Sequence, residues 1–229
     1  MKRALLLLML VAVAPAFGTI NVAVVQGDWW TPDALNYLNT LPNVQATPIT
    51  SYDAASLAPY QFVLHYGNSF YDPNALTQYI ADGGNLIATP WMMWNMNWAG
   101  SPASPVDYAM VNAVPSAPLN VKVNLPNDPY LAGVAFQNGD MVGYEATSAP
   151  RAGATTPAIW NNDGGVLLSY MPYGQGMSFY VNLHYITSDC TRAIDYGWGK
   201  QLLANIVLVP EPSALALLAL GGLGLLRRR

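Results

Sequence analysis

The chain has 229 residues, of which 52% are hydrophobic and 10% charged, with nine basic and thirteen acidic side chains. So few charges together with so much apolar content exclude an intrinsically disordered chain, and the length suits one domain of ordinary size or two small ones. The acidic balance opposes nucleic-acid binding, which requires a basic surface.

The N-terminus has the pattern of a secretory signal peptide. Lys2 and Arg3 form a positive n-region, residues 4–14 are apolar, and small residues up to Gly18 provide cleavage sites of the A-x-A kind. The apolar segment is shorter than a membrane span of about 20 residues. We therefore predict that residues 1–18 are a cleaved signal peptide rather than a permanent N-terminal anchor.

Residues 19–209 form the body of the protein, and its first half alternates strand and helix signals. One helix is expected with Thr31 as N-cap and Pro32 at the first helical position, and another opens at Asp72-Pro73 and stops at Gly83. Ile20–Val25 is a β-rich apolar run, as expected of a buried parallel strand, and three further strands are expected at Val44–Ile49, Gln61–Tyr66 and Asn85–Thr89. This alternation predicts an α/β domain with a doubly wound, mostly parallel sheet.

The second half of the body is less regular. The proline-rich residues 101–118 are predicted to form a long loop, and a last helix is expected over Asp189–Ile206, bent around Gly197 and Gly199. Further strands are expected at Asn120–Asn124, Met141–Glu145, Ala158–Trp160, Val166–Tyr170 and Met177–Leu183. The last two strands are joined by a hairpin-type turn at residues 172–176.

The C-terminus combines three features in a fixed order. An apolar run over Ser213–Leu226 is preceded by Val209, Pro210, Glu211 and Pro212 and followed by Arg227, Arg228 and Arg229. The run predicts a short C-terminal transmembrane helix, and the positive-inside rule keeps its arginines in the cytoplasm and the body outside the inner membrane.

These three features together resemble the PEP-CTERM sorting signal of Gram-negative bacteria, over residues 210–229. The resemblance implies recognition by an exosortase, a membrane cysteine protease-transpeptidase. It also implies removal of the tail and delivery to the cell surface or to the extracellular polysaccharide matrix. The alternative is a plain tail anchor.

The two terminal signals hold five of the nine basic residues of the chain. The body keeps four basic and twelve acidic side chains, which gives it a net charge of −8. The single cysteine, Cys190, excludes an internal disulfide and is either a buried apolar residue or an exposed free thiol.

The layout of the body resembles the class I glutamine amidotransferase-like superfamily, a flavodoxin-like type of fold, and especially its ThuA-like branches. The resemblance rests on Asn21–Leu41, on Asp72–Thr89 and on residues 174–206, where Gly-Gln-Gly leads into a strand and a helix. Active members place a nucleophilic cysteine after the strand equivalent to Asn85–Thr89, where this chain reads Pro-Trp-Met. Their late His-Pro-Glu corresponds here to His184-Tyr-Ile. We therefore expect no glutamine hydrolysis.

The carboxyl ends of the expected strands, where ligands bind in such sheets, carry several polar and aromatic residues, among them Asp28, His65 and His184. One hypothesis is that these three residues form a metal or acid–base site. The alternative is that both histidines are hydrogen-bonded structural residues. The spacing contains no metal-ligand signature such as H-x-x-x-H, and no metal or other cofactor is predicted.

Tryptophans are concentrated in one unusual segment. Trp91, Trp94 and Trp98 have the i, i+3, i+7 spacing of one helical face. They either pack in the core or form an exposed aromatic platform for sugar rings, whose C–H groups suit the apolar face of an indole.

Three classes of function remain open. We favour an exported surface or matrix protein whose non-catalytic body binds or scaffolds, with exopolysaccharide as the partner suggested by the sorting signal. The first alternative is a sugar-active ThuA-like enzyme that uses His184 and nearby acidic residues. The second is a partner-binding subunit of an export system.

Overall fold

The computed structural model of the chain describes residues 18–27, 30–50, 52–65, 72–92, 98–108, 113–145, 148–161, 163–186 and 191–209. Most of the predicted signal peptide, the tail from Pro210 on, and also Asp28, Trp94 and Cys190 lie outside these residues. Within the described part of the chain, no helix has the length and apolar character that a membrane crossing requires. The predicted transmembrane helix at residues 213–226 falls outside that part.

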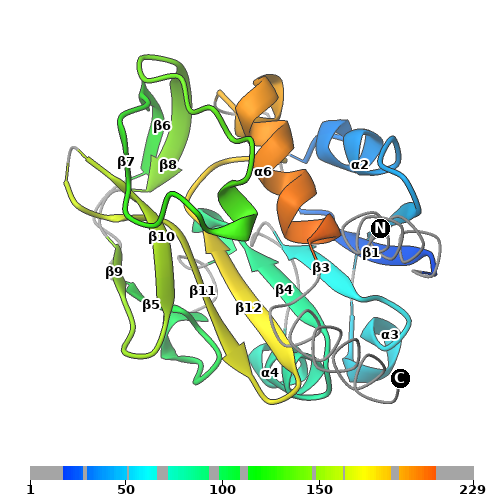
Figure 1. Cartoon of the computed structure of the whole chain (residues 1–229). Coiled ribbons are helices and arrows are strands. Elements are labelled where there is room, and N and C mark those ends of the chain that lie inside the picture. The colour runs from blue at the N-terminus through cyan, green and yellow to red at the C-terminus, as the bar shows by residue number, and fades with distance from the viewer. Residues whose placement is uncertain are drawn as a thin grey trace, which may run out of the picture.

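One large sheet organises the body, with the strand order β2-β1-β3-β4-β12-β11-β10-β7 (Figure 1). Its parallel half consists of β1 (Ile20–Val25), β2 (Val44–Ile49), β3 (Phe62–His65), β4 (Asn85–Ala88) and β12 (Gly176–Val181). Its antiparallel half adds β11 (Val166–Tyr173), β10 (Thr155–Trp160) and β7 (Val121–Val123). The doubly wound, mostly parallel sheet expected from the sequence is confirmed.

Helices cover both faces of the sheet, as Figure 1 shows. On one face, α2 (Asp33–Leu38) and α6 (Gly197–Leu208) contribute Leu38 and Leu202 to the same buried cluster as Val24 of β1. On the other face, α3 (Ala54–Leu57) and α4 (Pro73–Ala81) cover alternate residues of the same strands, with Leu57, Leu76 and Ile80 packed together with Val63 and Leu86. Central strands covered on both faces must be apolar throughout, which is why they are continuous hydrophobic runs in the sequence.

The two predicted helix starts differ in outcome. Asp72 caps α4 as expected, since its carboxylate accepts a hydrogen bond from the Asn74 N–H and Pro73 occupies the first helical turn. Thr31 does not cap α2; the N-cap position is Pro32, and no side chain caps it. The Thr31 hydroxyl instead accepts a hydrogen bond from Arg192, a contact between distant segments that overrides the local capping signal.

The hairpin between β11 and β12 is confirmed, and its turn packs tightly against the end of α4. Gly174 has φ +60°, and a Cβ there would lie 2.4 Å from the Cα of Ala81. Glycine is required at this position both for the left-handed backbone and for the close approach.

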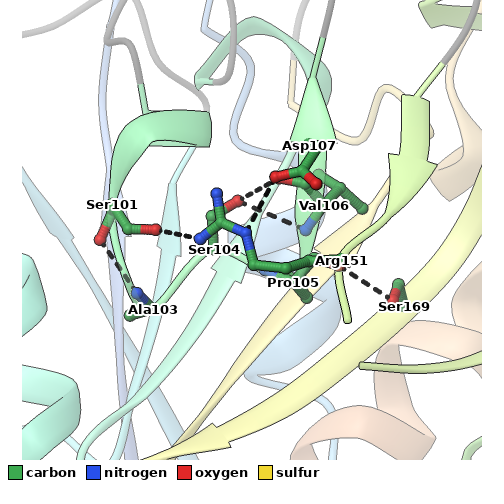
Figure 2. Close-up of polar contacts among 8 residues, drawn as sticks. All are labelled: Ser101, Ala103, Ser104, Pro105, Val106, Asp107, Arg151 and Ser169. Carbon is green, nitrogen blue, oxygen red and sulfur yellow. Dashed lines mark hydrogen bonds and ion pairs between the residues drawn. The ribbon is translucent and has the colours of Figure 1, made fainter. Parts of the chain in front are cut away.

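Residues 101–118, expected to be a loop, instead contribute two strands, and this prediction is wrong. β5 (Val106–Tyr108) pairs with the unpredicted β9 (Ser148–Pro150), and β6 (Ala113–Pro118) pairs with β8 (Met141–Glu145). The short helix η2 (Trp98–Gly100) precedes them. Figure 2 shows Arg151 joining the two segments of the first pair: its guanidinium donates to Asp107 at 3.0 Å and to the backbone carbonyl of Ser101. Such partners lie far apart in the sequence, so composition alone indicated a loop.

The last helix also begins later than predicted. Residues 193–195 form the short helix η4 (Ala193–Asp195), and α6 starts only at Gly197. Gly199 lies so close to the preceding turn that a Cβ would be 2.0 Å from the carbonyl oxygen of Ala193. The glycines therefore mark a helix start and a close approach rather than a bend. A further short helix, η3 (Pro129–Leu131), packs against α6.

Candidate functional site

The carboxyl edge of the parallel strands brings three segments together. β3 ends at His65, the neighbouring β4 ends at Ala88, and β12 on the far side of β4 leads to His184. The register pairs His65 with Ala88, and Ala88 with Tyr180. Both predicted histidines therefore lie at the same edge of the sheet, with β4 between their strands.

His65 is fully buried and held by a tyrosine. Its Nε2 lies 2.9 Å from the hydroxyl of Tyr52. The two rings are arranged edge to face, with 5.6 Å between their centroids. Burial lowers the pKa of His65 to about 3, because the apolar surroundings disfavour the charged imidazolium. The ring is therefore neutral at physiological pH.

His184 is held by a tryptophan from the neighbouring strand end. Residues 90–92 form a helical turn directly after β4, and the half-buried Trp91 points its indole at the imidazole. The Nε1–H of Trp91 donates to Nδ1 of His184 at 3.3 Å, and the ring planes are inclined by 81°. His184 is 2% exposed, and its backbone is fixed by hydrogen bonds to Gly143 and from Ala193.

Thr89, directly after β4, forms hydrogen bonds to the last residue of β3. Its backbone N–H and its hydroxyl both donate to the carbonyl oxygen of His65, at 3.2 Å and 3.1 Å. The hydroxyl thus donates to a backbone carbonyl at the end of the neighbouring strand. Neither Tyr52 nor Thr89 was predicted from the sequence as a partner of His65. Their contacts with it come from other segments of the chain, and no local sequence pattern indicates such contacts.

The predicted metal or acid–base site receives no support from the described residues. Within them, no group of three or more His, Cys, Asp or Glu side chains could hold a metal ion. Asp28, the third member of the hypothesis, lies outside the described part of the chain. For His65 and His184 the observed contacts, to Tyr52 and from Trp91, match the alternative of hydrogen-bonded structural histidines.

Of the two alternatives for the tryptophan segment, the structure matches core packing at Trp98. Trp98 is 0% exposed and packs in the core with Met92 and Leu76, so core packing holds there. Trp91 is half-buried and engaged with His184, and Trp94 lies outside the described residues. Trp98 therefore cannot present a ring face to a ligand.

Comparison with known families identifies the C-terminal segment. Residues 208–229 match the family model described as the PEP-CTERM protein-sorting motif. The match begins at Leu208, the last residue of α6, and includes Val209, whose extended backbone ends that helix. The sorting signal expected from the sequence is confirmed, and it marks the chain as an exported protein that an exosortase processes. A search of curated proteins finds no relative similar in sequence.

Solved structures identify the fold of the body. The cytoplasmic protein STM3548 from Salmonella typhimurium superposes with a TM-score of 0.56 at 13% identity, covering 82% of this chain and 97% of that one. PurLQS from Thermotoga maritima gives a TM-score of 0.56 at 11% identity, with coverages of 82% and 97%. A GMP synthase subunit from Thermoplasma acidophilum gives 0.52 at 13% identity, with coverages of 83% and 94%. The body therefore has a glutamine amidotransferase-like fold, as the sequence resemblance implied.

Proposed function

We propose that this chain is an exosortase substrate whose amidotransferase-like body has no hydrolytic activity and serves at the cell surface or in the extracellular matrix as a binding or scaffolding domain for exopolysaccharide. The observation that carries the non-catalytic part is the hydrogen bond from Trp91 to His184. The sorting motif at residues 208–229 carries the destination.

The position of Trp91 supports the absence of hydrolysis. Active members of the superfamily carry their nucleophilic cysteine on the turn after the strand equivalent to β4, and this chain carries Trp91 on that turn. A nucleophile needs a base within hydrogen-bond reach, and the base needs an available lone pair. Here the Nδ1 lone pair of His184 accepts the indole N–H of Trp91. An indole has no nucleophilic oxygen or sulfur to replace the thiolate.

The charge of the body supports an uncharged partner. Arg151 and Arg192, two of its four cations, are engaged in ion pairs with aspartates. The net charge of −8 opposes nucleic acids and strongly anionic polymers by simple repulsion. Neutral polysaccharide is the matrix component that this balance tolerates best.

Export and processing can be tested in the producing organism. The variant Pro210→Ala with Glu211→Ala should remain in the membrane fraction with its tail attached, and deletion of the exosortase should have the same effect. Pro126→Ala, at an exposed proline in a loop of the body, is the matched control and should be processed normally. Release of the double variant at the rate of the control would contradict the proposal.

The non-catalytic part is tested by assay of the purified full chain for glutamine hydrolysis and for conversion of free sugars. We expect no turnover above a boiled control. Turnover that disappears in His184→Gln would contradict the proposal and would support a sugar-active ThuA-like enzyme.

A further inference from the structure

A hollow of about 380 Å³ lies beside the first turn of α6, away from the histidines described above. Its polar and aromatic wall consists of Gln137, Asp140, Tyr196, Trp198 and Gln201, and small residues line the remainder. Residues 133–140 follow η3, whereas the other three come from the start of α6. Two distant segments of the chain thus meet to form one concave surface.

The aromatic part of this wall is held in place from both ends. The Tyr196 hydroxyl donates to the backbone carbonyl of Met141 at 2.8 Å, and its ring stacks on Trp198 with an interplanar angle of 11°. Trp198 is buried and also contacts Phe136, at 5.6 Å between ring centroids. Tyr196 itself is half-buried, so it presents part of a rigidly held ring at the surface.

Hydrogen bonds also hold polar groups of the wall in fixed orientations. The Nε1–H of Trp198 donates to Oδ2 of Asp140 at 2.8 Å, which orients the carboxylate and leaves Oδ1 without a partner among the described residues. The amide of Gln201 donates from Nε2 to Asn205 at 2.7 Å, so its carbonyl oxygen remains an acceptor. Gln137 is exposed and offers both a donor and an acceptor.

This combination suits a pyranose ring. An aromatic face accepts the axial C–H groups of a sugar, and carboxylate and amide side chains accept and donate hydrogen bonds to neighbouring hydroxyls. Among the described residues that line the hollow, Asp140 is the only charged one, so a uronate or a sulfated sugar would meet a negative charge without a compensating cation.

We infer that this hollow binds a neutral pyranose unit of a polysaccharide. The inference rests on the proposed function and names its site: the hollow at Tyr196 and Asp140, and not the tryptophan segment that the sequence suggested. The rigid wall keeps the cost of ordering side chains on binding low.

Calorimetric titration of the purified full chain tests this site. The probes are short gluco-, manno- and galacto-oligosaccharides, with an oligogalacturonate as the anionic probe. Tyr196→Ala should weaken binding of the best neutral probe about tenfold, since it removes the ring face. Gln137→Ala, at an exposed side chain, should weaken it by several fold.

Tyr37→Ala is the matched control. Tyr37 is also half-buried, and its hydroxyl also donates to a backbone carbonyl, that of Lys200. It lines a second hollow together with two aspartates, a lysine, Asn36, Thr40 and Ile194. This control should bind the neutral probe like the unmodified chain. If Tyr196→Ala proves unfolded by circular dichroism, the test rests on the other two variants. Gln137→Ala should weaken binding, and Tyr196→Phe, which keeps the ring, should retain it.

Each outcome separates the two proposals. Weaker binding of the neutral probe in Tyr196→Ala and Gln137→Ala, with unchanged binding in Tyr37→Ala, supports the site. Neutral-sugar binding that both variants retain overturns the site and leaves the proposed function intact. Binding of the oligogalacturonate alone overturns the inference of a neutral ligand. Binding of no saccharide overturns both the site and the saccharide part of the proposed function, while export by exosortase is judged by its own assay.

Discussion

Trp91 and His184, separated by 93 positions in the chain, are joined by a hydrogen bond of 3.3 Å from the indole Nε1 to the imidazole Nδ1. The bond ties the turn after β4 to the segment after β12, across the edge where parallel α/β sheets bind their ligands. It occupies Nδ1 of the histidine that the sequence resemblance aligns with the late histidine of the amidotransferase pattern. The relationship therefore bears on stability as well as on function.

Removal of the indole donor should destabilise the body. Trp91→Phe keeps a ring but leaves Nδ1 of the buried His184 without this donor, and we expect a loss of about 1 kcal/mol in unfolding free energy. Trp30→Phe is the matched control, because Trp30 is also partly buried and its Nε1 has no partner among the described residues. Urea denaturation should show a larger loss for Trp91→Phe; equal losses would mean that the hydrogen bond adds nothing.

Stability should fall in mildly acidic solution because of His65. Its pKa is about 3 in the folded state against an ordinary value of 6.5, so the unfolded chain binds the proton more readily between these values. Unfolding free energy therefore declines as pH drops from about 6.5 towards 3, by at most about 1.4 kcal/mol per pH unit.

Denaturation curves across that range should be compared with those of His65→Gln, which should show a shallower decline. The comparison is made above about pH 5, because Asp33 and Asp53, whose pKa values are lowered by hydrogen bonds from Arg192 and from the Ser56 N–H, reduce stability only as the pH falls from there through their ordinary value of 3.8. An identical decline in His65→Gln would show that another group is responsible.

Arg192 should stabilise the body by linking the start of α2 to the segment that leads into α6. It donates to the Thr31 hydroxyl at 2.6 Å, to Asp195 at 2.8 Å and also to Asp33, and this last contact lowers the pKa of Asp33. Arg192→Ala should cost about 1 kcal/mol, since half-exposed aspartates are screened by solvent, and the cost should shrink in high salt.

Lys122→Ala is the control for this loss of charge, because Lys122 is exposed on the edge strand β7. It should change the thermal midpoint little at any salt concentration. If the arginine variant is as stable as the lysine variant at low salt, the ion-pair network contributes nothing to the fold.

Alanine substitutions at two glycines with left-handed backbones should distinguish the cost of the backbone conformation from the cost of a steric clash. Gly174 has φ +60° and would place a Cβ 2.4 Å from Ala81, whereas Gly164 has φ +74° with nothing within 4 Å. Gly164→Ala should cost about 1 kcal/mol for the backbone alone, and Gly174→Ala more than about 3 kcal/mol because α4 must move. Chemical denaturation of both variants measures the difference, and similar costs would contradict the close approach at the hairpin.

The sequence by itself determined the features that depend on neighbouring residues. The buried strands β1, β3 and β4 were visible as largely apolar runs, and the start of α4 was visible in Asp72-Pro73. The sorting motif was equally evident, because an enzyme reads it as a short linear signal and not as a folded surface. These signals sufficed to predict an exported protein with a parallel α/β body.

Only the tertiary structure decided which distant residues meet. Local composition indicated a loop at residues 101–118, yet β5 and β6 form there because β9 and β8 supply their missing hydrogen-bond partners. The buried state of Trp98, the bond from Trp91 to His184, and the hollow at Tyr196 and Asp140 likewise depend on segments that the fold brings together. A backbone group or an apolar side chain can find its partner in any segment of the chain, so that partner is set by topology and not by the neighbours in sequence.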